Sequence, residues 1–231
     1  MQSNRYIFLY ASTMVVLVAL VLSGAATLLR PLQERNMRIE KMQNILATIN
    51  IEAPRGEAEA LFNRYIVATR IVDHQGNDLE GDAFEVDLQD ENRKDLPQRQ
   101  LPLFLAEVEG KQFVVVPLRG NGLWGPIWGY VGLADDLTTI VGANFDHSSE
   151  TPGLGAEIGD REFQDQFAGK KIFDEQGNFR PVRVIKGGAP AGDPHGVDGI
   201  SGGTITSNGV TAMIRDGLSV YEPTFKNMKN L

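Results

Sequence analysis

The stretch VDGISGGTITSNGV, residues 197–210, concentrates groups that could hold or carry a phosphate. It contains four glycines and four hydroxyl side chains, and its pattern predicts a helix that starts around residues 206–208. Backbone N–H groups in the first turn of a helix lack partners within the helix and favour an anion. Neither a Walker loop nor a G-x-G-x-x-G dinucleotide loop is present. From residue types alone, the stretch is either an unusual phosphate site or a glycine-rich turn whose Ser and Thr side chains cap a helix.

Two further stretches have the composition of ligand-contacting loops. The loop HSSETPGLGAE, residues 147–157, combines Pro with closely spaced glycines, which lets backbone approach a flat ligand, although an ordinary surface loop has the same composition. In GLWGPIWGY, residues 122–130, we expect Trp128 to pack in the core and Trp124 to face a ligand. The three histidines lie in separate loops with no metal-ligand spacing, so no metal site is predicted.

Composition excludes several classes of function. The 231-residue chain has a formal net charge of -8, which argues against nucleic-acid binding because that requires a basic surface. It has no Cys, so thiolate catalysis, disulfides and iron–sulfur ligation are excluded. Redox chemistry would therefore need a bound organic cofactor or a metal without thiolate ligands.

The N-terminal region predicts a membrane anchor. Residues 6–29 carry no charge, lie between Arg5 and Arg30, and exceed the roughly 20 residues that span a bilayer. A cleaved signal peptide is the alternative, because small residues occur at 23–26, but signal peptides have shorter apolar segments of about 7–15 residues. The basic residues after the span, at positions 30, 35, 38 and 41, outnumber those before it. The positive-inside rule alone thus favours a cytoplasmic domain.

The rest of the chain predicts an α+β fold. An apolar stripe through residues 39, 42, 45, 46 and 49 indicates either a stalk helix that continues the anchor or a helix docked on its own domain. The further elements expected are a helix in 53–65, a strand with a glycine-containing turn in 66–79, an exposed loop at 87–99, an antiparallel meander from 101 to 145, a short helix in 160–172, a strand in 180–188 and a final helix with a stop at Gly217. From these elements we expect one α+β domain behind one membrane anchor.

DGISGGTITSNGV closely resembles the flavinylation motif D-G-x-S/T-G-A-T/S-x-T of the covalent FMN-binding domain family. ETPGLG, residues 150–155, matches the second signature of that family. Together with GLWGPIWGY and TIVGANFDHSSE, these motifs resemble the C-subunit family of sodium-translocating NADH:quinone reductases over most of the chain. The G-subunit family of Rnf-type electron transport complexes shares both motifs and is the alternative among flavin carriers. A membrane-anchored binding module without flavin is the alternative from another class.

The resemblance implies that a flavin transferase esterifies the FMN phosphate to Thr206. Asp198 and Gly199 match the start of the flavinylation motif, and Gly203 departs from it because the family usually has Ala there. The remaining residues implied to bind the cofactor are Glu150, Thr151, Gly153, Leu154, Gly155, Trp124, Lys186, Ser201, Gly202 and Thr204.

The resemblance also implies a membrane anchor (1–30), a stalk helix with a family-specific α/β extension (31–100) and a covalent FMN-binding domain (101–231). It further implies a function and a location. The chain would relay single electrons through covalent FMN within a membrane complex, with no catalytic residue of its own, while other subunits bind NADH and ubiquinone. It would cross the bacterial inner membrane once and place its domain in the periplasm, against the charge rule. No carboxylate lies within residues 6–29, so we expect the sodium path to lie in other subunits.

Overall fold

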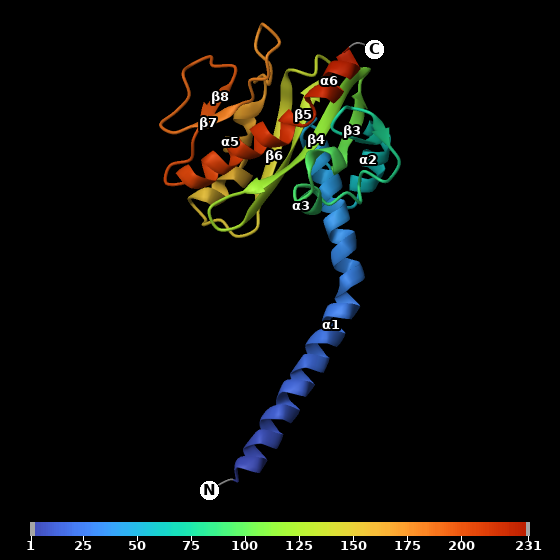
Figure 1. The fold of residues 1–231 in the computed structure, drawn as a ribbon, viewed down its shortest axis with the longest axis vertical. Coiled ribbons are helices and arrows are strands. Elements are labelled where there is room, and N and C mark those ends of the chain that lie inside the picture. The colour runs from blue at the N-terminus through green and yellow to red at the C-terminus, as the bar shows by residue number, and fades with distance from the viewer. Residues whose placement is uncertain (1–2, 230–231) are drawn as a thin grey trace. The chain divides into compact units, whose positions relative to one another are not determined.

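The computed structural model describes residues 3–229 (Figure 1). The chain divides into two compact units, of which the first ends at Lys41 and the second begins at Met42. The predicted α+β class is confirmed: a long apolar helix precedes a domain with an antiparallel sheet and helices.

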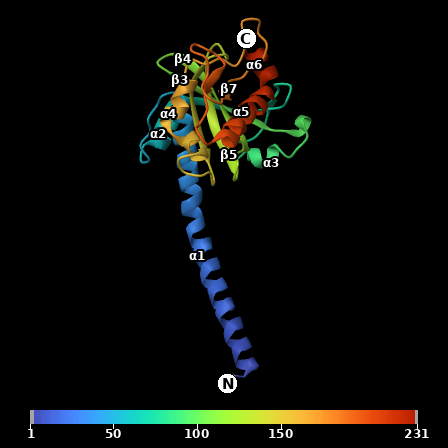
Figure 2. The same ribbon diagram turned by 90° about the vertical axis from the view of Figure 1, so that its left-hand side faces the viewer.

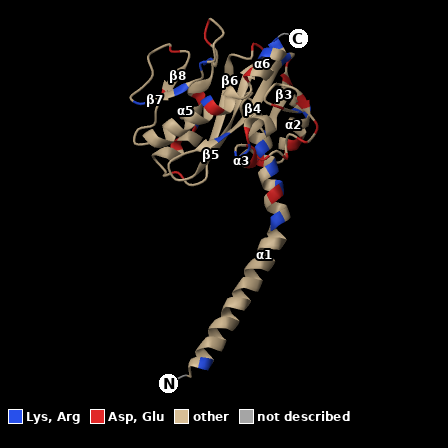
Figure 3. Ribbon diagram, in the orientation of Figure 1, with Lys and Arg blue, Asp and Glu red and all other residues tan. Residues whose placement is uncertain are grey.

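Helix α1 (Asn4–Ala47) is continuous and contains Pro31. Within residues 3–229 it is the one helix long and apolar enough to cross a membrane. Its side chains between Tyr6 and Leu29 are exposed and uncharged, and charged residues lie on both sides of this stretch, at Arg5 and from Arg30 onward (Figure 3). Its last turn lies in the second unit, where Met42, Ile45 and Leu46 are buried. The predicted apolar stripe therefore docks on the domain at its C-terminal end.

A six-stranded antiparallel sheet with the order β2-β1-β3-β4-β5-β6 forms the centre of the second unit. The strands are β1 (Ile66–Val72), β2 (Asp78–Leu79), β3 (Leu101–Val108), β4 (Lys111–Asn121), β5 (Pro126–Ala134) and β6 (Ile140–His147). The strand predicted in 66–79 is β1, and the predicted meander is β3 to β6. Antiparallel neighbours joined by short turns explain why the strand pattern was readable from the sequence.

Helix α5 (Thr204–Ser219) packs across the sheet, mainly against β4 (Figures 1 and 2). It buries Val210, Met213, Ile214 and Leu218 in the core that the sheet lines. The helix begins earlier than residues 206–208 and continues past Gly217, so the predicted start and stop are both wrong. A Cβ on Gly217 would lie 2.6 Å from Leu118 Cδ2, which shows that this glycine permits close helix–sheet packing and does not terminate the helix.

Shorter elements complete the domain. They are α2 (Ala58–Tyr65), α3 (Leu88–Glu91), α4 (Arg161–Gln164), α6 (Glu222–Lys229), the 3-10 turns at Leu96–Gln98, Gly155–Gly159 and Asp165–Phe167, and a parallel pair of β7 (Arg183–Ile185) and β8 (Gly196–Asp198). The segment 87–99 is not simply an exposed loop, because it contains α3 and buries the Glu91 side chain. The Glu91 carboxylate accepts hydrogen bonds from Lys94 Nζ at 2.7 Å and the Gln100 N–H at 2.9 Å.

Candidate functional site

The two glycine-rich loops meet at one hydrogen bond. Thr206 Oγ1 donates to Glu150 Oε2 at 2.6 Å, although the two residues are 56 positions apart in the sequence. The Thr206 side chain is 1% exposed and that of Glu150 is 5% exposed. The hydroxyl predicted to carry the cofactor is therefore buried against a carboxylate from the second predicted motif.

Glu150 is fixed from two sides. It follows β6, and its Oε1 atom accepts the Trp124 backbone N–H at 2.8 Å. Burial opposes its ionisation, but hydrogen bonds from the Thr206 hydroxyl and from the N–H groups of Trp124 and Leu123 outweigh that effect. The net result is a pKa below the ordinary value of a glutamate, so the carboxylate is negatively charged at neutral pH.

Glycines make this contact possible. A Cβ on Gly155 would collide with both Glu150 Oε2 and Thr206 Oγ1. A Cβ on Gly122 would lie 2.9 Å from the Glu150 carboxyl carbon. Gly202 has a φ of +73° and Gly153 has a φ of +75°, a region in which L side chains are strained. Several glycines in these loops are thus needed for close approach or for backbone conformation.

Thr206 is the third residue of α5, and Gly203 precedes the helix without providing a side-chain cap. The first turn contains no acidic residue. Its N–H groups therefore form an electropositive end without an acidic side chain in the same turn. Gly203 is also close to the second loop, since its Cβ would lie 3.4 Å from the Gly155 nitrogen.

Exposed apolar side chains lie on the segments that meet at Glu150 and Thr206. Trp124 is 66% exposed, and Leu123, Leu154 and Ile205 are also exposed. Leu154 lies over the flavinylation motif, because a Cβ on Gly202 would reach its Cδ2 atom at 2.5 Å. Trp128, expected in the core, is only half-buried on β5.

The remaining predicted residues lie at the periphery of this site. Asp198 Oδ1 accepts the Ala189 N–H at 2.7 Å, and the Gly199 N–H donates to Ile185 O at 2.9 Å. Lys186 is exposed, and a Cβ on Gly199 would lie 3.4 Å from its Cα. The residues Thr151, Ser201 and Thr204 are at least partly exposed on the two loops. The structure thus brings both motifs together and places Lys186 beside the start of one of them.

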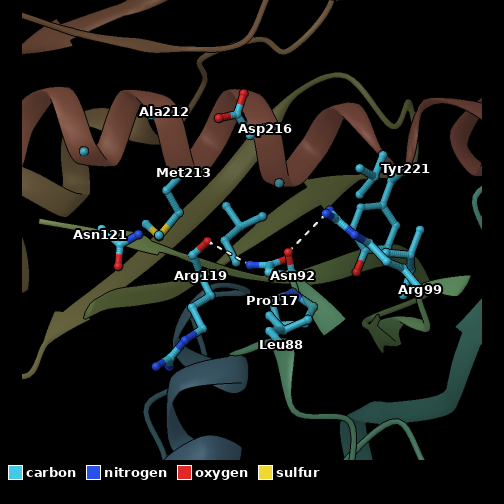
Figure 4. A pocket seen from close by; sticks show the side chains of 16 residues that line it. Leu88, Asn92, Arg99, Pro117, Arg119, Asn121, Ala212, Met213, Asp216 and Tyr221 are labelled. Atoms are coloured by element: carbon cyan, nitrogen blue, oxygen red, sulfur yellow. Dashed lines mark hydrogen bonds between the residues drawn. The ribbon is translucent and has the colours of Figure 1, made fainter. Parts of the chain in front are cut away.

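The domain has a cleft at the two motifs and a separate cavity beside α5. One cleft of about 400 Å³ lies between the two motifs, and its rim includes the acidic side chains of Glu157, Asp160, Glu162 and Asp198. Another cavity, of about 330 Å³, lies between α5, β4 and the α3 segment (Figure 4). Its lining includes Arg99, Asn92, Asp216 and Met213, and it contains none of the predicted cofactor-binding residues. Among residues 3–229 no group of three or more His, Asp or Glu side chains is placed to hold a metal.

Sequence reasoning missed two features of the site. It did not predict the Glu150–Thr206 contact, for which spacing along the chain gives no signal. It also overlooked Ser207, a buried residue whose Oγ accepts the Ile200 N–H at 3.3 Å and so ties the motif to the helix start. The exposed apolar positions were visible in the sequence, since Leu123 follows Gly122 and Ile205 lies between Thr204 and Thr206.

Comparison with known proteins gives consistent matches. The family described as "FMN-binding domain" matches residues 122–219. The C subunit of the Na(+)-translocating NADH-quinone reductase of Vibrio anguillarum is 37% identical over 213 residues, covering 83% of this chain and 81% of that protein. The corresponding C subunit of Pseudomonas aeruginosa is 32% identical and covers 91% and 95% of the two chains.

A solved structure agrees with these sequence matches. The crystal structure of the C subunit of this reductase from Parabacteroides distasonis is 44% identical, with a TM-score of 0.79, and covers 85% of this chain and 96% of the other. Sequence and structure together show that the chain belongs to the C-subunit family of Na(+)-translocating NADH-quinone reductases.

Proposed function

We propose that this chain is an electron-transfer subunit of a membrane-bound, sodium-translocating NADH:quinone oxidoreductase, and that it carries FMN esterified to Thr206. The observation that carries the proposal is the meeting of DGISGGTIT and ETPGLG at the Thr206 hydroxyl. The relatives named as C subunits of the quinone reductase support this reading over the Rnf alternative.

The residues present fit FMN in three respects. The start of α5 offers backbone N–H groups to a phosphate, with no side-chain cap and no acidic residue in its first turn. Trp124 and Leu154 offer exposed apolar surface to a flat ring. The glycines at 153, 155 and 202 let backbone come close to such a ring. FMN, when bound, supplies the capacity to accept and donate single electrons, and the protein sets its orientation and surroundings.

Covalent attachment is tested by mass measurement. After co-expression with a flavin transferase, the peptide containing residues 201–215 should carry the mass of FMN, and the denatured chain should fluoresce under ultraviolet light. Thr206→Ala should abolish both signals, Thr206→Ser should retain the adduct because the hydroxyl survives, and Thr204→Ala should leave it in place. An adduct on Thr204, or none at all, would refute the assignment. A chain without any flavin would favour the binding-module alternative.

The proposal also includes the orientation of the domain. Residues 6–29 anchor the chain in the inner membrane, and the domain that follows lies in the periplasm, where lost FMN is not readily replaced. Large domains translocate largely regardless of flanking charge, so Arg30 and its basic neighbours do not prevent this orientation. Protease added to spheroplasts should digest the domain while sparing cytoplasmic controls. Resistance until the membrane is broken would place the domain in the cytoplasm, as the charge rule predicts.

A further inference from the structure

The environment of the Thr206 hydroxyl contains more than an attachment point requires. A hydroxyl that only received a phosphate would need exposure and a nearby anion site. This hydroxyl instead donates a 2.6 Å hydrogen bond to an ionised carboxylate. An O–H donor and a charged acceptor at this distance form a short, charge-assisted hydrogen bond.

The carboxylate is itself oriented by a third group. Glu150 Oε1 accepts the Trp124 N–H at 2.8 Å, and this leaves Oε2 directed at Thr206. Gly122 and Gly155 leave room for the carboxylate in that position, since a Cβ on either glycine would contact it. Nucleophile, base and orienting group in hydrogen-bonded series are the arrangement that activates a hydroxyl for covalent chemistry.

We propose that Glu150 is the proton acceptor when Thr206 is esterified, so that the substrate chain supplies the general base for its own flavinylation. This inference rests on the proposed attachment of FMN to Thr206. The co-reactant is a flavin dinucleotide, in which the FMN phosphorus is joined to a nucleotide through a pyrophosphate.

Atoms and charges balance in this step. A bond forms between Thr206 Oγ1 and the FMN phosphorus, and the pyrophosphate P–O bond breaks, which releases a nucleoside monophosphate. The proton leaves Oγ1 for Glu150 Oε2 and then passes to solvent. In protein kinases a carboxylate likewise accepts the proton of the substrate hydroxyl during phosphoryl transfer.

Access to Oγ1 requires movement of Gly155 but not of Glu150. Gly155 covers the hydroxyl, as the collision of its added Cβ with Oγ1 shows. Gly153 has a φ of +75°, and its N–H donates to Glu157 Oε1 at 2.9 Å. Withdrawal of Gly155 must therefore break this hydrogen bond and those from the Leu154 and Ala156 N–H groups to Thr151 O. Glu150 is held separately, by Trp124 and by its place after β6. None of the loop hydrogen bonds that would break involves the Glu150 carboxylate, so the base can stay in contact with the nucleophile when Gly155 moves.

The test is single-turnover flavinylation of the full chain in detergent, with excess flavin transferase and flavin dinucleotide, followed by intact mass. Glu150→Gln keeps the size and shape of the side chain, but it replaces one acceptor oxygen with an NH2 donor and removes the basicity. We expect it to slow adduct formation by about 10²–10⁴-fold, the usual contribution of general-base catalysis. Glu150→Ala should be similarly slow. Formate should raise the rate of adduct formation in Glu150→Ala by at least about tenfold, because it replaces the missing carboxylate. Chloride at equal ionic strength should not raise this rate.

The matched control is Glu91→Gln, which neutralises another buried, hydrogen-bonded carboxylate outside the site. Its rate should stay within about twofold of wild type, since Glu91 does not contact the nucleophile of the proposed transfer. A loss of less than about tenfold in Glu150→Gln, or a loss in Glu150→Ala that formate does not relieve, would overturn the role of Glu150 as base. Absence of the adduct from the wild-type chain would instead refute the proposed function, and this role with it.

Discussion

Replacing Gly155 with Ala should separate the two motifs and destabilise the domain. The φ of Gly155 is not in the left-handed region, so its backbone can accept Ala and the cost is steric. The added methyl would collide with Glu150 Oε2 and Thr206 Oγ1 and would lie 3.1 Å from Thr206 Cβ. Overpacking costs about 1–3 kcal/mol, and losing a hydrogen bond to a charged group costs about 1.5–3 kcal/mol. Because the displaced carboxylate can turn toward solvent, the two costs overlap, and we expect a loss of about 2–4 kcal/mol.

Urea unfolding of the full chain in detergent measures this loss. The midpoint should fall with an unchanged m-value, because the same surface is exposed on unfolding. Gly56→Ala is the control: no described atom lies within 4 Å of its added Cβ and its φ is not left-handed, so it should change stability by less than about 0.5 kcal/mol. In a Thr206→Ala background the Gly155→Ala cost should shrink by about 1 kcal/mol, because one of the colliding atoms is gone. Equal stability of the Gly155 and Gly56 variants would refute the steric argument.

Two further substitutions test the packing and the electrostatics of the domain. Gly217→Ala should destabilise the chain by about 1–3 kcal/mol despite the better helix propensity of Ala, because its Cβ would lie 2.6 Å from Leu118 Cδ2; urea unfolding would contradict this if the variant were more stable. Burial of Asp136 opposes its ionisation, but hydrogen bonds from Thr139 and Thr138 outweigh that effect and hold the pKa of this carboxyl below its ordinary value. The stabilisation is therefore present at neutral pH and lost as the pH falls through the lowered pKa of the folded state. Asp136→Asn should lower stability at pH 7 and flatten the decline below about pH 4 in urea titrations at several pH values.

Local patterns predicted the strands well and the helix boundaries poorly. Alternating apolar residues and glycine-containing turns define β3 to β6 because these neighbouring strands follow one another along the chain, whereas β1 pairs with β3 across β2 in the sequence. Gly217 was misread as a stop signal, since a glycine that permits close packing on Leu118 has the same sequence appearance as a glycine that ends a helix. The segment DLQDE did contain a capping signal: the Asp87 side chain accepts the Gln89 N–H at 2.7 Å and starts α3.

The candidate site was predictable as two motifs but not as a mechanism. The motif residues identify Thr206 and the loop at 150–155 through resemblance. The hydrogen bond that joins them depends on how the end of β6 and the start of α5 meet in the folded domain, which no spacing along the chain encodes. The sequence therefore indicates which residues belong to the site, whereas their chemical roles follow only from the contacts.

The same contact implies that modification changes the role of Glu150. In the unmodified chain the Glu150 carboxylate accepts a hydrogen bond from the Thr206 hydroxyl. Glu150→Gln should therefore lower the free energy of unfolding by about 1.5–3 kcal/mol, because it weakens hydrogen bonds to a charged group. Esterification replaces the Thr206 hydroxyl with a phosphodiester anion. Two like charges about 4 Å apart repel by about 4 kcal/mol at an effective dielectric constant of 20. Glu150 must then take up a proton or turn toward solvent, so Glu150→Gln should cost little in the flavinylated chain or stabilise it. Urea unfolding of wild type and Glu150→Gln, each with and without the adduct, measures the coupling between the side chain and the modification. An equal cost of Glu150→Gln in both states would show that the phosphate does not lie beside Glu150.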